Sequence, residues 1–403
     1  MRKYLKYFGV VAVLALGIWC GTRWNVWFGN PEELPYQPSA APSRVLLTFG
    51  DSCATSRNVS WTCDSVVKPS FLEVYDETAD SAFKIKASGE VFRSRAGVAA
   101  YYVAKLRGLS VGHSYRYMAV TDTMRSPEYR FRVEDPTETA FLYVGDVQDT
   151  LGGIANVLLK KACRKNPDAQ FLVCGGDLTE RPMDSYWRET FCTLDSIGQS
   201  MPVMTTTGNH DYLKKIIRKL ERRFSLVHSY FLDSMVGENQ VFTLVHGDVQ
   251  FFLLDSNREF FYLFTQRAWL KEKLQKSTAK WKIVVSHHPL HSVRGKKNLV
   301  QRWMFDDLVK EYDVTLLLHG HEHAYARMTN EGKTPVYTVS HCSPKNYKIK
   351  PGDKFDKALN NSRYYQKVRT HGDTLFVSAY DAVSGARVDS VQIFKNGTVH
   401  EKK

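Results

Sequence analysis

The chain has 403 residues, 43% hydrophobic and 24% charged, so it exceeds a single typical domain and has ample apolar side chains for buried cores. Its formal net charge is +13, but no nucleic-acid-binding motif accompanies this charge, and charge alone does not establish that function. The seven cysteines include no Cys-x-x-Cys pair, which argues against a zinc finger or a thioredoxin-like site.

The first residues predict a targeting segment over 1–24. Three basic residues precede an uncharged run over 7–22, which Arg23 closes and which tryptophans flank at its far end, as at a membrane interface. The run is slightly short for a membrane span, and no Ala-x-Ala cleavage site follows it. We keep three alternatives: an uncleaved anchor, a cleaved signal peptide, or lipidation at Cys20, which bulky Trp19 disfavours. Each of these three alternatives predicts that the rest of the chain is exported to a bacterial-type periplasm or the cell envelope, because the basic N-terminal flank stays on the cytoplasmic side.

Residues 25–42 carry four prolines and predict an extended tether. Over 43–135, short alternating runs separated by turn residues predict about seven strands and therefore an all-β sandwich. The runs lie at 44–49, 58–63, 71–75, 83–87, 99–106, 114–120 and 128–133. Cys53 and Cys63 flank a turn-rich part of this domain and are the best candidates for a disulfide.

Five short motifs rich in metal ligands follow in order, each after an apolar run. They are Gly145-Asp146-Val147-Gln148, Gly175-Gly176-Asp177, Gly208-Asn209-His210-Asp211, Ser286-His287-His288-Pro289 and His319-Gly320-His321-Glu322-His323. The preceding runs, at 139–144, 170–174, 202–206, 281–285 and 314–318, predict strands buried on both faces. Carboxylates, an amide and imidazoles suit two divalent ions, and such a pair can activate water for displacement at phosphorus.

The segments between these motifs predict a layered α/β core. Helix-like stretches lie at 154–165, 184–197, 265–276 and 299–311, and two more strands at 374–379 and 387–394 complete a catalytic domain over 136–403. Ligands of such cores gather at the carboxyl ends of the strands. The basic run 214–223 is typical of a solvated amphipathic helix, or of a positive field that attracts an anionic substrate.

The order Asp, Asp, Asn-His, His, His-x-His resembles the calcineurin-like metallophosphoesterase superfamily, and the upstream β-domain resembles its purple acid phosphatase branch. The resemblance covers roughly 43–400 and implies a four-layer α/β core, a β-sandwich flanked by helices, preceded by a fibronectin-type sandwich. It implies two divalent ions (Mn, Zn or Fe), the first held by Asp146, Asp177 and His323, and the second by Asp177, Asn209, His287 and His321. His210 matches the histidine that the family places beside the scissile bond.

Two positions depart from the purple branch. Glu180 stands where that branch has the tyrosine that binds ferric iron and gives the colour. Gln148 stands where the branch has glycine, and its amide oxygen is either an extra ligand of the first metal or a hydrogen-bond partner of the ligands.

These features predict an exported phosphoesterase that cleaves phosphomonoesters by a hydroxide held between two ions, with the N-terminal segment as its contact to a membrane. His210 would protonate the leaving oxygen, with Asp211 as an orienting partner. A phosphodiesterase or a nucleotide pyrophosphatase is the alternative activity. A catalytically silent exported binding module is the alternative of another class, and the complete ligand set disfavours it. The candidates for contact with the phosphorylated substrate are His291, Arg181, Arg258, Arg294 and Arg327, whereas His288 is expected to face away or line the pocket.

Overall fold

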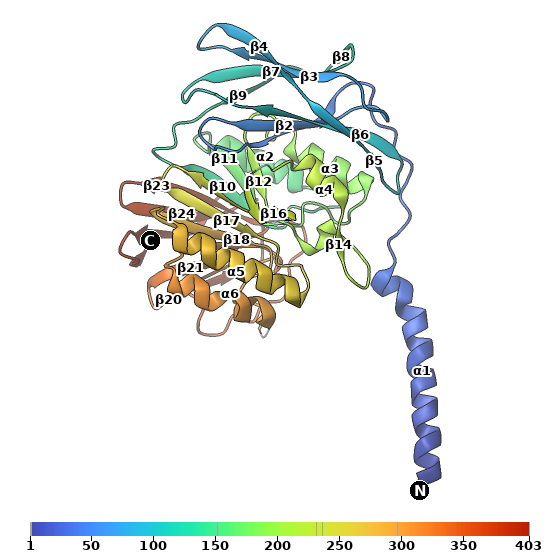
Figure 1. The fold of residues 1–403 in the computed structure, drawn as a ribbon. Helices are drawn as coiled ribbons and strands as arrows, with labels where there is room; N and C mark the ends of the chain where they lie inside the picture. Colours follow the sequence, from blue (N-terminus) through green and yellow to red (C-terminus); the bar gives the residue numbers. More distant parts are fainter. Residues whose placement is uncertain (1, 151, 231, 236, 296, 403) are drawn as a thin grey trace.

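The computed structural model describes residues 2–150, 152–230, 232–235, 237–295 and 297–402. It begins with one long helix, α1 (Arg2–Phe28), which projects away from the globular part (Figure 1). Within α1, Tyr7–Phe28 is long and apolar enough to cross a membrane, and none of it is buried against the rest of the chain. A signal sequence has the same character, so this helix is compatible with both an anchor and a signal peptide.

The segment after α1 is docked on the C-terminal domain. Residues 29–42, all described by the structure, form neither helix nor strand, as the prolines predict. The Glu33 carboxylate is nevertheless almost fully buried, 2.9 Å from Arg223 Nη2 and 3.1 Å from Arg95 Nη2, and it accepts the backbone N–H of Asp184 at 2.9 Å. Because two guanidinium groups hold this carboxylate, this segment without helix or strand is fixed to the globular part of the chain.

The all-β domain predicted next consists of two packed sheets. The first has the strand order β1-β2-β6-β5 and the second β4-β3-β7-β8, with β9 also paired to β7. The strands are β1 (Ser43–Phe49), β2 (Arg57–Thr62), β3 (Ser70–Asp76), β4 (Ser81–Lys86), β5 (Ser88–Arg93), β6 (Val98–Leu106), β7 (Ser114–Thr121), β8 (Met124–Arg125) and β9 (Tyr129–Arg132). Their inward side chains form one core, in which Trp61 stacks on Tyr102 with ring centroids 5.6 Å apart. The sequence pattern did not predict strand β5, because this strand is exposed along nearly its whole length and shows no apolar alternation.

The C-terminal domain has four layers, two central sheets with helices on both outer faces (Figure 1). The sheets have the orders β12-β11-β10-β23-β24-β25-β26 and β15-β16-β17-β18-β19-β21-β20-β22. The elements as far as α5 are β10 (Ala140–Val144), α2 (Ala155–Lys165), β11 (Phe171–Cys174), α3 (Asp184–Leu194), β12 (Val203–Thr205), a 3-10 turn (Asn209–Asp211), β13 (Tyr212–Leu213), β14 (Lys219–Leu220), α4 (Arg222–Val227), β15 (Asp233–Met235), β16 (Glu238–His246), β17 (Val249–Leu254) and α5 (Phe260–Lys276). The remaining elements are β18 (Trp281–Ser286), α6 (Leu299–Glu311), β19 (Leu316–His319), β20 (Tyr325–Asn330), β21 (Lys333–Val339), β22 (Lys357–Leu359), β23 (Tyr364–His371), β24 (Thr374–Asp381), β25 (Arg387–Phe394) and β26 (Val399–Glu401).

The apolar runs before the motifs are buried on both faces, which explains why they show no alternation. In β10, Phe141 and Tyr143 lie in the core between the two sheets, whereas Leu142 and Val144 lie in the core under α2 and α3. On the other side of the molecule, α5 and α6 cover the eight-stranded sheet through a third core. The predicted four-layer α/β architecture behind an all-β domain is therefore confirmed.

Two local predictions are wrong. The basic run 214–223 is not a helix along its length, because Tyr212 pairs with Leu220 and Leu213 with Lys219, which makes 214–218 the tip of a β-hairpin. All seven cysteines lie in the described part of the chain and carry free thiols, so the disulfide between Cys53 and Cys63 is not formed.

Candidate metal centre

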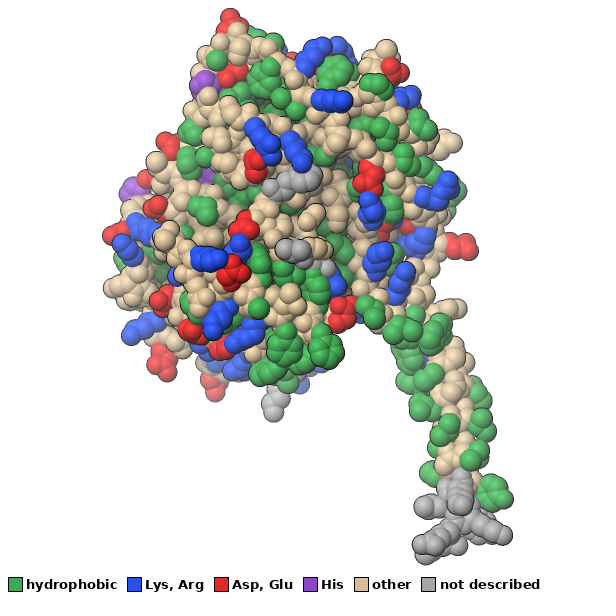
Figure 2. Space-filling model, in the orientation of Figure 1, with side chains coloured by type: hydrophobic (Ala, Val, Ile, Leu, Met, Phe, Trp, Pro, Cys, Tyr) green, Lys and Arg blue, Asp and Glu red, His purple; other side chains and the backbone are tan. Residues whose placement is uncertain are grey.

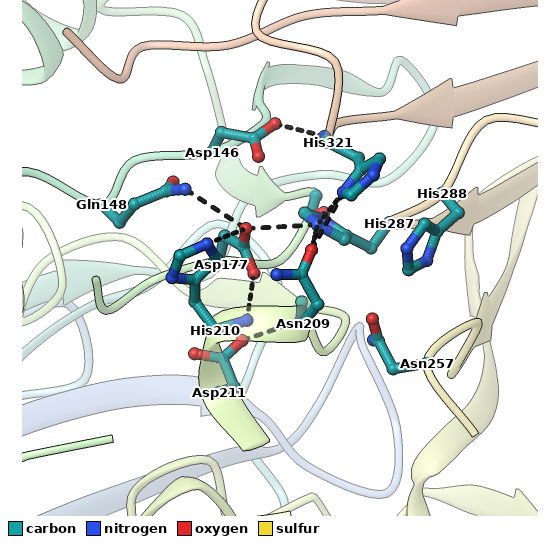
Figure 3. Close-up of polar contacts among 12 residues, drawn as sticks. Asp146, Gln148, Asp177, Asn209, His210, Asp211, Asn257, His287, His288 and His321 are labelled. Atoms are coloured by element: carbon teal, nitrogen blue, oxygen red, sulfur yellow. Dashed lines mark hydrogen bonds and ion pairs between the residues drawn. The ribbon is translucent and has the colours of Figure 1, made fainter. Parts of the chain in front are cut away.

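The five motifs meet where strands of both central sheets end. Asp146 and Asp177 follow β10 and β11 of one sheet, and His287 and His321 follow β18 and β19 of the other. Since β10 is parallel to β11, and β18 is parallel to β19, the carboxyl ends meet at a common edge of each sheet. The side chains converge there from both sheets (Figure 3).

Four of the converging residues have a left-handed backbone. The φ angles are 45° at Asp146, 51° at Asp177, 70° at His321 and 45° at His323. Such a conformation costs on the order of 1–3 kcal/mol for a residue with a Cβ, and it clusters at functional sites where the surrounding structure enforces it. Gly208 allows the close approach of the third motif, because a Cβ there would collide with Asp177.

One half of the site contains Asp146, Gln148 and His323. His323 Nδ1 donates to the Lys345 carbonyl at 3.1 Å, so in the neutral ring the lone pair lies on Nε2, which faces Asp146 Oδ1 at 3.5 Å. Asp146 Oδ1 and Gln148 Oε1 are buried without a hydrogen-bond partner among the described residues. Gln148 Nε2 donates to Asp177 Oδ2 at 3.2 Å, so this amide both contacts the ligands and presents a free oxygen.

The other half contains Asn209, His287 and His321. His287 Nδ1 donates to the Gly175 carbonyl at 2.9 Å, which leaves Nε2 3.1 Å from Asn209 Oδ1 and 3.3 Å from Asp177 Oδ2. His321 Nδ1 lies 2.9 Å from the same Asn209 oxygen and 3.3 Å from His287 Nε2. Asp177 therefore lies between the two halves of the site.

Burial and mutual charge perturb the acids and bases of this site. Burial raises the pKa of Asp146 to about 8, and the neighbouring Asp177 adds to this rise. Burial opposes the ionised form of Asp177 as well, but the charge and hydrogen bond of His287 outweigh it and lower the pKa of Asp177. Burial would likewise lower the pKa of His287, but the carboxylates outweigh it and raise that pKa to about 9.

The donor atoms fit metal ions. Ligand atoms of Asp146, Asp177 and His287 all lie within 4.8 Å of one another. Around them, imidazole lone pairs face carboxylate and amide oxygens, and two buried oxygens have no partner among the described residues. Electron-rich donor atoms held this close are stabilised by a cation among them, and oxygen with imidazole donors suits Mn, Zn or Fe.

His210 lies at the rim of the site, with its side chain 28% exposed. Its Nδ1 donates to the Glu180 carbonyl at 2.6 Å, and its Nε2 lies 4.0 Å from Asp177 Oδ2. Asp211 instead accepts the backbone N–H of Gly208 at 2.8 Å and is otherwise buried. The group that orients His210 is thus the Glu180 carbonyl and not Asp211, and Asp211 shapes the turn that presents the motif.

Arg181 borders the site, in a pocket of about 120 Å³ that it lines together with Asn209, His210 and Glu180. Arg294 lies over the Tyr347 ring at 4.3 Å, and that ring lies 4.4 Å from the His323 ring. Both arginines therefore stay candidates for phosphate contact.

The other substrate-contact candidates have different partners. His291 is buried and pairs with Asp306 of α6 at 2.9 Å, and Arg327 is buried against Asp389 at 2.7 Å, so carboxylates engage both of these side chains. Arg258 lies over the Tyr262 ring at 3.7 Å, which directs its guanidinium toward α5.

His288 is partly buried behind the proposed metal ligand His321. Its ring centroid lies 4.2 Å from that of His321, and its Nδ1 pairs with Ser256 Oγ at 3.0 Å.

Sequence reasoning missed Asn257, whose side chain lies beside His288 and Asn209 (Figure 3). Asn257 Nδ2 donates to the Thr207 carbonyl at 2.8 Å, and its Oδ1 is buried without a partner among the described residues. The signal was present, because Asn257 follows a buried apolar strand, β17, as the five motifs follow theirs.

Comparison with known proteins agrees with this geometry. Residues 139–325 match the family model of the calcineurin-like phosphoesterases, and residues 42–133 match that of the purple acid phosphatase N-terminal domain. Purple acid phosphatase 23 of Arabidopsis thaliana is 25% identical over 174 residues, which cover 41% of this chain and only 37% of that relative.

Two solved structures share the fold. A purple acid phosphatase from yellow lupin (Lupinus luteus) seeds superposes with a TM-score of 0.73 at 16% identity, over 88% of this chain and 74% of that one. The structure of PhoD superposes with a TM-score of 0.66 at 13% identity, over 93% and 94% of the two chains. At these identities the likeness concerns the fold alone.

The four layers and the converging donors define a class of protein, the metallophosphoesterases, whose dinuclear metal centre lies at the edge of two packed sheets. The chain therefore contains a calcineurin-like phosphoesterase domain, preceded by a domain of the purple acid phosphatase N-terminal type.

Proposed function

We propose that the chain is a metal-dependent phosphoester hydrolase that acts first of all on phosphomonoesters. The observation that carries this proposal is the convergence of Asp146, Asp177, Asn209, His287 and His323, whose donor atoms approach one another in pairs at 3.1 to 3.5 Å. In this proposal residues 136–403 form the catalytic domain, 43–135 a positioning domain, and 1–42 the membrane segment with its docked tether.

Asp146, Asp177 and His323 would hold one ion, and Asp177, Asn209, His287 and His321 the other. Gln148 would add its free amide oxygen to the first group. When bound, two such ions supply Lewis-acid chemistry that activates water and offsets charge on the phosphoryl oxygens. The carbonyls of Gly175 and Lys345 fix the tautomers of His287 and His323, so both rings present a lone pair.

His210 would give the proton to the leaving oxygen. Its Nδ1–H is engaged by the Glu180 carbonyl, so the proton available for transfer is the one on Nε2, which faces the site beside Asp177. The partly exposed ring can exchange this proton with solvent between turnovers. Such assistance is typically worth about 10²–10⁴-fold in rate.

An exported enzyme anchored by α1 fits the apolar helix and its basic N-terminal flank. In this arrangement the catalytic domain lies outside the cytoplasm, in the periplasm or at the cell envelope.

The test is a hydrolysis assay of the purified full chain, loaded with manganese, zinc or iron, on phosphomonoesters, phosphodiesters and nucleotides. Faster cleavage of monoesters, abolished in Asp177→Asn, supports the proposal. Preference for diesters or nucleoside polyphosphates would assign it to the alternative activities. Full metal content without hydrolysis of any ester would instead indicate the catalytically silent binding module.

A further inference from the structure

The end of α1 is joined to the pocket beside His210. Lys214 donates its backbone N–H to Asn30 Oδ1 at 2.8 Å, and Asn30 Nδ2 donates to the Lys214 carbonyl at 2.8 Å. The Lys214 ammonium reaches the Val26 carbonyl in the last turn of α1 at 3.1 Å. Asn30 and Lys214 both line the pocket that contains His210. A bilayer crossed by α1 would therefore begin next to the candidate active site.

The hairpin tip, residues 214–218, together with the adjoining Lys219, has the character of a membrane-binding loop. Ile216 and Ile217 at its apex are 74% and 67% exposed. Four basic residues flank them, Lys214, Lys215, Arg218 and Lys219, and the tip contains no acidic residue. Apolar side chains at such a tip enter the headgroup region, while each Lys or Arg near an anionic leaflet adds about 1 kcal/mol of attraction.

A second apolar surface, the aromatic patch, lies at the N-terminal ends of α5 and α6. It consists of Phe260, Phe261, Phe264, Leu299, Val300 and Trp303. Phe261 is 83% exposed and Trp303 is 62% exposed, and Phe260 stacks on Trp303 with ring planes 2° apart. Exposed patches of this kind mark interaction surfaces, and tryptophan is typical of the membrane interface.

The hairpin tip, the aromatic patch and the candidate site share one side of the molecule. Helices α5 and α6 begin after the carboxyl ends of β17 and β18, the edge at which the metal ligands lie. The hairpin follows directly after the Asn209–Asp211 turn. In Figure 1 the β14 hairpin and these ends of α5 and α6 lie on the side from which α1 departs, and in Figure 2 hydrophobic side chains gather at this lower surface beside the helix.

From these contacts, and resting on the proposed phosphoester hydrolysis, we propose that this face lies on the bilayer and that the substrate is a lipid with a phosphomonoester headgroup. The basic side chains of Arg181, Lys214 and Arg218 line the pocket between the bilayer face and His210 and would receive the headgroup. In the reaction, the oxygen of water adds to phosphorus and the P–O bond to the lipid alcohol breaks. The alcohol oxygen takes a proton from His210, and orthophosphate leaves. The proton that the water loses passes to solvent, from which His210 takes a proton before the next turnover. A lipid surface fits better than a protein partner because the apolar helix, the basic tip and the interfacial tryptophan all face it.

The experiment uses the full chain reconstituted in phosphatidylcholine vesicles that contain phosphatidic acid. Its rate on phosphatidic acid is divided by its rate on soluble glycerol 3-phosphate in parallel vesicles. The variant is Ile216→Ser with Ile217→Ser. The matched control is Met124→Ser with Val245→Ser, two residues that are 42% and 54% exposed, in strand β8 and near the end of β16 that lies opposite the site.

We expect the rate ratio of the isoleucine variant to fall about tenfold or more, because two side chains lose their apolar contact with the bilayer, while the control keeps the wild-type ratio. An unchanged ratio in the isoleucine variant overturns the inference. So does a wild-type chain that cleaves glycerol 3-phosphate but not phosphatidic acid, an outcome that leaves the proposed hydrolysis standing. Cleavage of neither ester overturns the proposed function, and this substrate class with it.

A second measurement tests the docked face without hydrolysis. The fluorescence of Trp303, obtained as the difference between the wild-type chain and Trp303→Phe, should be quenched by brominated phosphatidylcholine in the vesicles. Buried Trp281 should not be quenched, because only 1% of its surface is exposed. An unquenched Trp303 overturns the docking and points to a protein partner for the aromatic patch.

Discussion

Lys345 Nζ lies 2.6 Å and 2.7 Å from the two carboxylate oxygens of Glu180. Glu180 stands where the purple acid phosphatases have their iron-binding tyrosine, and here this side chain is held by an ammonium group. The carbonyl of Glu180 orients His210, and the carbonyl of Lys345 orients His323. One ion pair thus ties together two loops, one of which positions the proposed proton donor and the other a proposed metal ligand.

We expect the metal-loaded protein to be colourless, since the purple charge transfer needs a phenolate bound to ferric iron. Tyr347 is the tyrosine whose ring packs against His323, and burial raises its pKa, so the protonated phenol is favoured at neutral pH. Visible spectra of the iron-loaded chain and of Tyr347→Phe should both lack an absorption band. A band that disappears in Tyr347→Phe would mean that this phenol binds the metal, and a band lost in Tyr186→Phe would assign that role to Tyr186.

The position of Asp177 between the two halves of the site leads to a second prediction. Asp177→Asn should remove most of the metal and nearly all hydrolysis, because one substitution takes a charged ligand from both ions. Metal content after dialysis, measured by mass spectrometry, checks this, with exposed Asp195→Asn as the control. Two full equivalents of metal in Asp177→Asn would contradict the bridging role.

His210→Ala separates proton donation from phosphate binding. An alkyl phosphate, whose leaving oxygen needs a proton, should slow by about 10²-fold or more, whereas an activated aryl phosphate should lose far less. The two kcat values are compared in the same metal-loaded preparation, with exposed His371→Ala as the control. Equal losses on both esters would mean that His210 binds the phosphate or shapes the site.

The ligands were predictable from sequence because each follows its strand directly, so a local pattern carries both the position and the chemistry. Asp146 comes two residues and Asp177 three residues after a buried strand, and the parallel strands bring them together. The partners of those ligands were not predictable. Lys345 lies 165 residues from Glu180 in the chain and Glu33 lies 190 residues from Arg223, and no local pattern encodes such a pair.

Two predictions differ from the structure for a related reason: the role of Asp211 as partner of His210, and the helix over the basic run. Asp211 follows His210 in sequence, but the 3-10 turn directs its carboxylate back to the Gly208 N–H, so neighbours in the chain do not become partners in space. Residues 214–218 carry enough charge for a helix surface, but pairing of Leu213 with Lys219 folds them into a tip.

Stability should depend on pH through His228. This ring is buried against Phe224 and Tyr230 with no hydrogen-bond partner among the described residues, and burial lowers its pKa to about 3. In the unfolded chain the pKa is about 6.5, so below that pH only the unfolded chain takes up the proton. The stabilisation is complete above pH 6.5 and declines as the pH falls toward 3, by about 2 kcal/mol at pH 5.

His228→Phe should remove this component while keeping an aromatic ring in the same core. Free energies of unfolding, measured in denaturant at pH 7 and pH 5, should therefore differ less in the variant than in the wild-type chain. Equal differences in the two proteins would show that His228 becomes protonated in the folded state.

The last prediction concerns the docked segment after α1. Arg223 is 2% exposed, and Glu33 is one of three carboxylates that neutralise it there, the others being Glu221 at 3.0 Å and Asp184 at 3.7 Å. Glu33→Ala leaves part of a buried positive charge uncompensated and should cost about 3 kcal/mol of unfolding free energy. Glu32→Ala, at the exposed neighbouring position, should cost little, because an exposed charge of this kind contributes at most about 1 kcal/mol.

Limited proteolysis gives a second measurement of the docked segment. Its release should expose residues 29–42 to cleavage in Glu33→Ala and not in Glu32→Ala. Cleavage at equal rates in both variants would mean that the segment is not bound to the domain in solution. Asn30 and Pro31 would then not line the pocket that contains His210.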